Sequence, residues 1–459
     1  MTDSLKCVSP VDGSVYATRA LMPLEGARAA VSRARAAQAE WAARPMAERI
    51  ACLRKAVELI GAANDEIVAE LAWQMGRPVR YGGEFGGFKE RALYMAEIAE
   101  QALADIEIEE SAAFHRYIRR VPQGLVLVVA PWNYPYMTAI NTVAPALIAG
   151  NAVMLKHASQ TPLVGERIIF ALHDAGVPED VAQNVFLSHD TTSALIAAGA
   201  FDFVNFTGSV GGGKAIERAA AGTFTGLGLE LGGKDPGYVM EDADLDAAAD
   251  GLMDGAMFNS GQCCCGIERI YVAESVYEPF VEKCVEIVSK ARLGNPLNPE
   301  TTMGPMAQAR FADLVRAQTA EAIEAGATAL IDPALFPEND GAYLMPQILT
   351  GVDHSMRVMR EESFGPVVGI MRVKDDAEAI DMMNDSEFGL TASLWTRDAG
   401  RAARLGDAIE TGTVFMNRCD YLDPALCWTG CKNTGRGAGL SVLGYHALTR
   451  PKSYHLKKG

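Results

Sequence analysis

The sequence predicts an α/β protein whose centre is a doubly wound, mostly parallel sheet with helices on both faces, followed by a second α/β unit. Between residues 125 and 221, short apolar runs alternate with helical patterns at regular spacing. The run Leu125–Ala130 is apolar throughout and stops at Pro131, which is typical of a strand buried on both faces. Strand–helix alternation of this kind places parallel strands in one sheet and covers them with helices.

Before this sheet the sequence indicates mainly helices. Residues 24–43 are rich in Ala and Arg and predict a helix. Pro45 suits the start of a following helix, because its missing N–H is not needed there. Apolar residues recur at helical spacing over residues 50–71, which predicts two helices ending at Gly76 and Pro78.

The remaining elements are predicted from the same strand and helix periodicities. The Gly-rich stretch Tyr81–Gly87 is interpreted as a loop. A second α/β unit begins after residue 235. The predicted strands are His115–Val121, Leu125–Ala130, Ala152–Lys156, Asn184–Leu187, Phe203–Phe206, Arg269–Val272 and Ser453–Lys458. The predicted helices are 162–175, 191–199, 211–221, Leu245–Phe258 and Val276–Ala291.

Composition narrows the class of protein. A chain of 459 residues favours two or three domains. The net charge of −17 argues against nucleic acid as a partner, because phosphate binding needs a basic surface. Residues 1–10 lack the apolar core of a signal peptide, and no apolar run reaches membrane-spanning length. Nine cysteines, an odd number, indicate free thiols, so we expect a soluble cytoplasmic protein with no membrane partner.

Three adjacent cysteines, Cys263, Cys264 and Cys265, form the first candidate site. A nucleophilic cysteine reacts as its thiolate, and a free thiol has a pKa of about 8.5, so it needs an activating environment or a neighbouring base. Gly261 precedes the triplet and lets the backbone approach a substrate closely. Taken alone, the triplet fits equally well with three small buried hydrophobic side chains.

Two other segments place polar side chains where chemistry is expected. Glu230 stands between two leucines and before two glycines, so its carboxylate could be desolvated and act as a base. Asn133 follows the strand predicted over residues 125–130, and ligands bind at the carboxyl ends of such strands. Its side-chain N–H could donate to a developing oxyanion. The alternatives are an exposed turn for Glu230 and a capping turn for Asn133.

The segment Phe206–Ala215 has the order strand, glycines, helix, which predicts an anion site at the helix N-terminus. It nearly matches a nucleoside-triphosphate P-loop, but Ala215 replaces the Ser or Thr that would hold magnesium. This argues against a phosphotransferase. In Glu361–Pro366, a glutamate could accept hydrogen bonds from ribose hydroxyls and Phe364 could pack on a flat ring, with a polar turn as the alternative.

In combination, these motifs resemble the aldehyde dehydrogenase superfamily from about Val8 to the end of the chain. The segments Glu-Leu-Gly-Gly-Lys and Gly-Gln-x-Cys are specific signatures, and here Glu230 and Cys264 are 34 residues apart, as in that family. The resemblance implies a doubly wound NAD(P)-binding domain (residues 1–110 and 124–233) and an α/β catalytic domain (234–435). It also implies a small antiparallel oligomerisation sheet (111–123 and 436–459), and hence a homodimer or homotetramer.

Residue by residue, the resemblance makes Cys264 the nucleophile and Glu230 the general base, with Asn133 and the Cys264 backbone N–H as the oxyanion hole. An aldehyde is then oxidised to a carboxylic acid with NAD or NADP through a thioester that is hydrolysed, and no metal is required. The implied cofactor-binding residues are Trp132, Lys156, Ser159, Gly208, Ser209, Gly213, Leu231, Glu362 and Phe364. Cys263 and Cys265 are interpreted as packing residues.

The chain also departs from the family pattern. Ser159 stands where many members carry a glutamate that binds the adenosine ribose, which predicts that NADP is accepted as well as NAD. Cys427-Trp428-Thr429-Gly430 replaces the usual Pro-Phe-Gly-Gly, and Thr142 replaces a basic residue. Arg418, Asp420 and Tyr421 occupy the presumed substrate loop. These differences leave the substrate open.

Three alternative functions are disfavoured by particular residues of the sequence. A P-loop phosphotransferase is disfavoured by Ala215. A catalytically silent member of the fold would be expected to lack Cys264 or Glu230, and both are present. A phosphorylating or acyl-CoA-forming reductase would share the nucleophile but is expected to lack the base that hydrolyses the thioester, so Glu230 favours hydrolysis.

Overall fold

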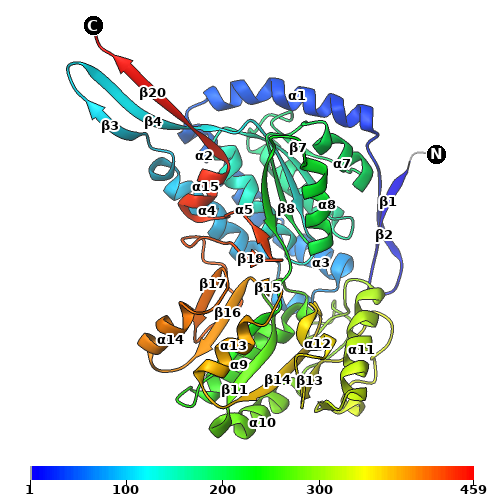
Figure 1. The fold of residues 1–459 in the computed structure, drawn as a ribbon. Helices are drawn as coiled ribbons and strands as arrows, with labels where there is room; N and C mark the ends of the chain where they lie inside the picture. Colours follow the sequence, from blue (N-terminus) through cyan, green and yellow to red (C-terminus); the bar gives the residue numbers. More distant parts are fainter. Residues whose placement is uncertain (1–2) are drawn as a thin grey trace.

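The structure is a computed structural model that describes residues 3–459. Figure 1 shows two α/β parts, one above the other, and a narrow sheet that projects away from them. The chain begins with a hairpin of β1 (Ser4–Val8) and β2 (Val15–Ala20). It continues with α1 (Leu24–Ala43), α2 (Met46–Ala62), α3 (Asn64–Met75), the 3-10 turn η1 (Val79–Tyr81) and α4 (Phe85–Ala102). No helix among the described residues is long and apolar enough to cross a membrane.

The loop predicted over Tyr81–Gly87 is too long, because α4 begins at Phe85. Gly86 and Gly87, in the first turn of α4, suggested a loop. Phe88, Ala92 and Met95 follow them at helical spacing, however, and are buried. That apolar face stabilises the helix more than the glycines weaken it.

The upper sheet has six strands in the order β19-β9-β8-β5-β6-β7. All neighbours from β9 to β7 are parallel, and only β19 is antiparallel. The strands are β5 (Leu125–Ala130), β6 (Ala152–His157), β7 (Ala182–Asn184), β8 (Phe203–Thr207), β9 (Gly226–Glu230) and β19 (Gly435–Arg436). The connecting helices are α5 (Pro135–Ile148), α6 (Pro162–Asp174), α7 (His189–Ala197) and α8 (Val210–Ala220). This is the predicted doubly wound sheet.

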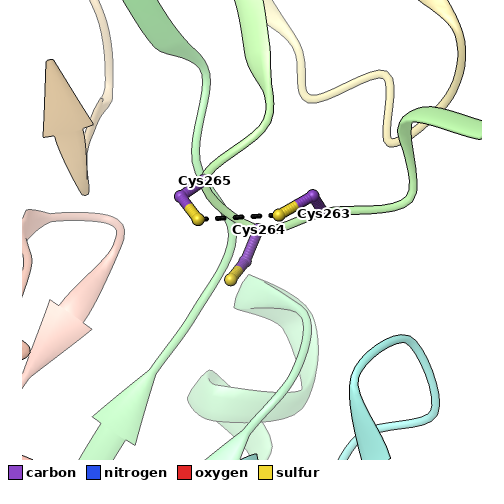
Figure 2. Close-up of side chains that lie close together, drawn as sticks. All are labelled: Cys263, Cys264 and Cys265. Carbon is purple, nitrogen blue, oxygen red and sulfur yellow. Dashed lines mark hydrogen bonds between the residues drawn. The ribbon is translucent and has the colours of Figure 1, made fainter. Parts of the chain in front are cut away.

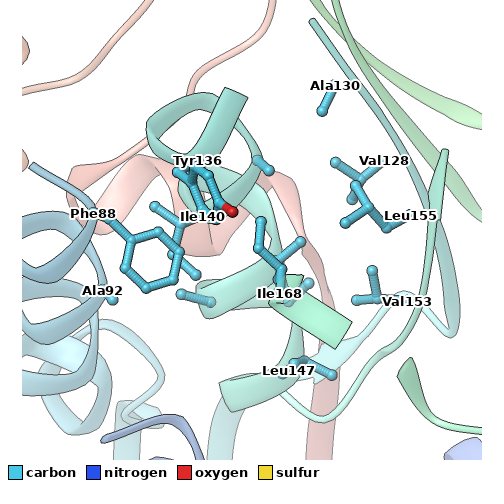
Figure 3. Packing of buried hydrophobic residues seen from close by; sticks show 14 of the residues in the cluster. Phe88, Ala92, Val128, Ala130, Tyr136, Ile140, Leu147, Val153, Leu155 and Ile168 are labelled. Atoms are coloured by element: carbon cyan, nitrogen blue, oxygen red, sulfur yellow. The ribbon is translucent and has the colours of Figure 1, made fainter. Parts of the chain in front are cut away.

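Strand β5 shows why helices must cover both faces of this sheet. All six of its residues are buried, and their side chains alternate between two hydrophobic clusters. Val126, Val128 and Ala130 pack with α4, α5 and α6, as Figure 3 shows for the side with Phe88 and Tyr136. Leu125, Leu127 and Val129 pack on the other face with α1, α7 and α8.

The strand predicted over Asn184–Leu187 is displaced, because β7 covers Ala182–Asn184. Val185 still donates a backbone hydrogen bond to Leu155, but the carbonyl of Phe186 accepts from Met22 instead of continuing the sheet. The apolar residues beyond Asn184 are buried as a link to the N-terminal hairpin, which the apolar pattern alone could not reveal.

The lower sheet has seven strands in the order β12-β13-β14-β11-β10-β16-β17. Its strands are β10 (Asp235–Val239), β11 (Ile267–Ala273), β12 (Thr328–Ala329), β13 (Gln347–Thr350), β14 (Val367–Val373), β16 (Thr391–Trp395) and β17 (Thr413–Met416). Its helices are α9 (Leu245–Met257), α10 (Tyr277–Val288), α11 (Ala309–Glu324), α12 (Arg357–Arg360), α13 (Asp376–Asn384) and α14 (Ala399–Gly406). Smaller elements are η2 (Phe258–Gly261), η3 (Glu274–Val276), η4 (Pro333–Leu335), β15 (Phe388–Gly389) and β18 (Cys431–Lys432).

The third sheet contains β3 (Ile106–Glu110), β4 (Phe114–Pro122) and β20 (Thr449–Lys457). Helix α15 (Ser441–Ala447) directly precedes β20 in the chain. The predicted strand near 115–121 and the predicted terminal strand are β4 and β20, which pair antiparallel along their whole length. β3 also belongs to this sheet, although the predicted boundary at residue 110 left it out. Its alternating Ile and Glu residues are a strand pattern that the sequence analysis overlooked.

Candidate active site

Two cavities meet where the upper and lower sheets face each other. The first, of about 380 Å³, lies between α4, α5, the cysteine triplet and the loop 420–428. The second, of about 280 Å³, opens toward α8 and the segment 362–364. The residues that line both cavities are Thr138, Thr207, Glu230, Leu231 and Cys264. Cys264 and Glu230 therefore face a shared junction that can be reached from two sides.

The loop that carries Cys264 has an unusual backbone. Asn259, Ser260 and Gly261 all have positive φ, at 54°, 57° and 70°. A Cβ on Gly261 would lie 2.3 Å from the backbone carbon of Gly365, so only glycine fits there. Three left-handed residues in succession turn the chain sharply between α9 and β11. This turn brings Cys264 to the junction of the cavities.

The side chains of the triplet point in different directions, as Figure 2 shows. The sulfurs of Cys263 and Cys265 face each other at 3.5 Å. Both thiols donate to Oδ1 of Asp420, at 3.1 Å and 3.0 Å. Cys264 Sγ lies apart from that pair, and Cys264 alone of the three also lines the second cavity.

Asn133 is held rigidly beside this loop. It is buried, and its Nδ2 donates to the carbonyl of Gln262 at 3.2 Å. Its own carbonyl accepts from Arg77 at 2.5 Å and from Asn259 at 3.2 Å. Arg77 is in turn paired with Glu84 at 2.6 Å in the interior. One N–H of the Asn133 amide is thus engaged, and the other remains for a ligand.

Glu230 ends strand β9 and accepts a hydrogen bond from Thr207 Oγ1 at 3.2 Å. Burial raises the pKa of its carboxyl to about 7, with a further contribution from the negative charge of Cys264. A carboxyl that titrates near neutral pH can both take up and release a proton under ordinary conditions.

Gly232 and Gly233 allow two other groups to come close to this junction. A Cβ on Gly233 would lie 2.5 Å from the carbonyl oxygen of Cys264, and one on Gly232 would lie 2.2 Å from the Glu362 carboxylate. The Gly233 N–H donates to Glu362 at 3.0 Å. Burial raises the pKa of Glu362 to about 8. Because these two glycines have no Cβ, the segment 362–364 and the Cys264 loop can pack closely against the chain that follows β9.

The second cavity has the chemistry that a nicotinamide dinucleotide requires. Trp132 stacks on Phe311 at 5.4 Å between ring centroids and meets Phe364 edge-on at 5.6 Å, which gives an apolar wall for flat rings. At the other end, Ser209 caps α8, whose first N–H groups suit an anion. A Cβ on Gly211 would meet nothing within 4 Å, so open space lies over this helix end.

The structure brings together most of the predicted cofactor residues. Those that line the second cavity, together with Asn133, Glu230 and Cys264, are Trp132, Gly208, Ser209, Leu231, Glu362 and Phe364. Lys156, Ser159 and Gly213 do not line it. Lys156 is buried at the end of β6, and Ser159 lines another cavity beside Lys6 and Gln308. Gly213 packs under Leu231, where a Cβ would lie 2.6 Å from the leucine side chain.

Sequence reasoning missed several residues of the site. Arg77 supports the Asn133 loop, Thr207 contacts Glu230, and Phe311 completes the aromatic wall. Arg91, on α4, lines the first cavity. They come from separate elements, and none stands in a motif that would mark it. Asp420 was assigned to the substrate loop, but its bonds to two cysteines depend on tertiary contact.

A cysteine and a carboxyl that titrates near neutrality lie where two cavities meet, and one of these cavities has an aromatic wall and a helix N-terminus that suit a dinucleotide. The chain belongs to the aldehyde dehydrogenase family: the sequence model of that family matches residues 1–454. The protein is thus an NAD(P)-dependent aldehyde dehydrogenase, which oxidises an aldehyde to an acid through a cysteine thioester.

Relatives of this chain cover almost its whole length. A succinate-semialdehyde dehydrogenase [NADP(+)] from Deinococcus radiodurans is 33% identical over 450 residues, which cover 97% of this chain and 93% of that one. A vanillin dehydrogenase from a Pseudomonas species is 35% identical over 444 residues, covering 94% and 89%. The crystal structure of an NAD-dependent aldehyde dehydrogenase from Sinorhizobium meliloti has a TM-score of 0.95 at 32% identity, covering 100% of this chain and 92% of that one.

The backbone of the Cys264 loop gives a first prediction. Gly261→Ala introduces a Cβ at positive φ and against Gly365, so the loop must shift and Cys264 should lose its reactivity. We expect the rate of Cys264 alkylation by iodoacetamide, followed by peptide mass spectrometry, to fall at least about tenfold, because a misplacement of about 1 Å can cost about 100-fold in rate. Gly86→Ala, where a Cβ meets nothing within 4 Å, is the control. Equal alkylation rates in both variants would refute the account of this turn.

Proposed function

We propose that Cys264 is the nucleophile, Glu230 the general base, and Asn133 with the Cys264 backbone N–H the oxyanion hole. The observation that supports this assignment is the position of Cys264 and Glu230 at the junction of both cavities. The aldehyde then enters through the first cavity. The second cavity holds the dinucleotide, with Trp132 and Phe364 against its flat rings and Glu362 as an acceptor for its ribose hydroxyls.

Each residue has a separate task in the proposed reaction. The Cys264 thiolate attacks the aldehyde carbon, and the free N–H of the Asn133 amide donates to the oxygen that becomes negative. The bound nicotinamide supplies a hydride acceptor. The Glu230 carboxylate then takes a proton from water, which attacks the Cys264 thioester and releases the acid and the thiolate.

The pKa of Glu230 predicts the pH dependence of hydrolysis. The carboxylate is the active form, and with a pKa of about 7 it is lost as the pH falls through 7. We expect kcat to fall about tenfold for each pH unit below 7 and to level off above it. In Glu230→Gln this dependence should vanish, and rapid mixing should show a burst of reduced cofactor followed by slow turnover.

The control for this experiment is Glu217→Gln, which alters an exposed carboxylate paired with Arg436. Its pH profile should match that of the unaltered enzyme. Steady turnover by Glu230→Gln at the rate of the unaltered enzyme would remove Glu230 from the role of base.

The surroundings of Arg91 indicate which class of aldehyde the enzyme oxidises. Its guanidinium lies in the wall of the first cavity and is buried, yet no carboxylate of residues 3–459 forms an ion pair with it. Nη1 donates to Met137 at 3.2 Å and to Asn141 at 3.4 Å, whereas Nε has no partner. Arg91 Nη2 has no hydrogen-bond acceptor among residues 3–459. A buried cation without a counter-ion is costly, so a bound anion would be stabilised there.

We therefore propose that the substrate is an aldehyde with a carboxylate at its far end. The relative from Deinococcus radiodurans is named for such a compound, succinate semialdehyde. Two carboxylates of the cavity have partners of their own: Asp420 accepts two thiols, and Glu90 accepts the hydroxyl of Tyr421 at 2.6 Å. Arg91 is the cationic side chain in the lining of this cavity, so we assign it to the anionic end of the substrate.

The test compares kcat/KM for a carboxylate-terminated aldehyde with that for an uncharged aldehyde of equal length. Arg91→Gln should lower this ratio by about 10–100-fold, the effect of one charge-assisted hydrogen bond. Arg91→Lys should retain part of the preference. Because a ratio is measured, partial unfolding of a variant does not affect it. An unchanged ratio in Arg91→Gln would contradict the proposal, while continued oxidation of the uncharged aldehyde would leave the catalytic roles intact.

We also propose that the enzyme accepts NADP in addition to NAD. Support comes from the absence of a glutamate at Ser159 and from the NADP(+) in the name of the Deinococcus relative. Ser159 lines a separate cavity beside Lys6 and Gln308, so this argument rests on the family pattern, which places a ribose-binding glutamate at this position. A carboxylate there would repel a 2′-phosphate, whereas Ser159 would not. We expect Ser159→Glu to lower kcat/KM for NADP more than for NAD. A preference of the unaltered enzyme for NAD above about a hundredfold would contradict this.

The projecting sheet supports a homodimer or homotetramer. Its outer strands β3 and β20 each have an unpaired edge, and Ile106, Ile108 and Leu456 are about half exposed. Free edges and exposed apolar side chains favour association with a second copy. Light scattering at micromolar concentration should give a multiple of 49.1 kDa, and Ile106→Lys with Ile108→Lys should reduce it. A monomeric mass for the unaltered chain would contradict this.

We propose a cytoplasmic location on the basis of the cysteines. All nine are free in the structure, which fits a reducing compartment. Recovery of the protein from a secreted or membrane fraction of its source cells would contradict this.

A further inference from the structure

The pair Cys263 and Cys265, together with Asp420, forms a compact group that the proposed mechanism does not use. The two sulfurs are 3.5 Å apart, and both lie within 3.1 Å of the same Asp420 oxygen. Cys264 Sγ completes a set of three sulfurs that all lie within 4.8 Å of one another. All four side chains line the first cavity, so a small solute can reach them from the substrate side.

The spacing of these atoms suits a thiophilic metal ion. Zinc binds thiolate sulfur at about 2.3 Å and carboxylate oxygen at about 2.0 Å. Two sulfurs 3.5 Å apart, each about 2.3 Å from one ion, subtend about 100° at that ion, close to the tetrahedral angle. The sulfur–oxygen distances of 3.1 and 3.0 Å correspond to angles of about 90°. For Cys263, Cys265 and Asp420 only small side-chain rotations are therefore needed, whereas Cys264 Sγ, which lies apart from this pair, has to rotate toward the ion. Thiolate ligands select zinc over magnesium or calcium.

We propose that Cys263, Cys265 and Asp420 form a binding site for Zn²⁺, with Cys264 Sγ as the fourth ligand, and that the bound ion inhibits the enzyme reversibly. Each thiol that binds the ion gives its proton to water, so binding releases one proton per cysteine and changes no oxidation state. The ion lies in the wall of the first cavity and binds the sulfur of Cys264. The inhibition, but not the binding, rests on the proposed role of Cys264.

The first experiment measures binding directly and does not depend on turnover. Metal-free enzyme is titrated with Co²⁺, which reports thiolate ligands by a sulfur-to-cobalt charge-transfer band, and Zn²⁺ is then added in competition with a chromophoric chelator. We expect one ion per chain. Loss of an outer-shell partner already costs about 10–100-fold in metal affinity, so Cys263→Ser with Cys265→Ser should raise the Kd for Zn²⁺ by about 100-fold or more.

The matched control is Cys52→Ser, which removes a half-buried thiol on α2, outside the cluster. It should leave both the charge-transfer band and the Kd unchanged. Asp420→Asn should weaken binding but retain the band. Thermal melting of each variant shows whether it is folded, and Asp420→Asn provides a second route if the double cysteine variant is not.

Inhibition is tested on the same proteins. Micromolar Zn²⁺ should stop aldehyde oxidation by the unaltered enzyme, a chelator should restore it, and the inhibiting concentration should rise in each variant in step with its Kd. The proposal is overturned if the double variant binds Zn²⁺ within about threefold of the unaltered enzyme, or if Cys264→Ala alone abolishes binding that the double variant retains. Tight binding without inhibition would leave the site intact and would instead contradict the role of Cys264.

Discussion

The backbone of the Cys264 loop is in close contact with two other segments, and the rest of the site depends on these contacts. Gly233, between β9 and β10, approaches the carbonyl of Cys264, and Gly261 lies against Gly365, which precedes β14 of the lower sheet. A side chain at either glycine would overlap backbone atoms. Cys264 is therefore positioned by main-chain packing between segments that flank the two sheets, which is more rigid than a side-chain contact.

Buried polar groups hold together the segments that flank the site at the edge of the lower sheet. Lys234 and Glu268 form an ion pair in the interior, and Glu268 also accepts the backbone N–H groups of Ser363 and Phe364 at 2.8 Å. Arg269 donates to the carbonyl of Lys234 at 2.9 Å. Removal of one partner would leave a charge unpaired in the interior, at a cost of about 3–5 kcal/mol. The same network holds Phe364 at the wall of the second cavity.

Much of the fold could be predicted because its signals are local. The buried strand Leu125–Ala130 and the helix over residues 24–43 follow from short-range periodicity, and both are present. The predictions failed where tertiary contacts decide: α4 begins earlier than its glycines suggest, and β7 ends where the chain turns to pair with Met22.

The site divides in the same way. Cys264, Glu230 and Asn133 stand in recognisable motifs, and the structure places all three in the lining of the second cavity. Arg91 and Asp420 come from other elements, and their importance follows from what surrounds them. The sequence alone does not show that Arg91 is buried with no ion pair to residues 3–459, or that two thiols share one oxygen of Asp420, because both features depend on tertiary contacts.

The central claim is that a covalent acyl intermediate forms on Cys264. The most direct measurement is peptide mass spectrometry of Glu230→Gln, quenched in acid after mixing with aldehyde and oxidised cofactor. Slow hydrolysis in that variant should let the thioester accumulate. The account predicts an added acyl mass on the peptide that contains Cys264, localised to that residue, in proportion to the burst of reduced cofactor. A full burst with no adduct on Cys264, or with the adduct on Cys263 or Cys265, would contradict it.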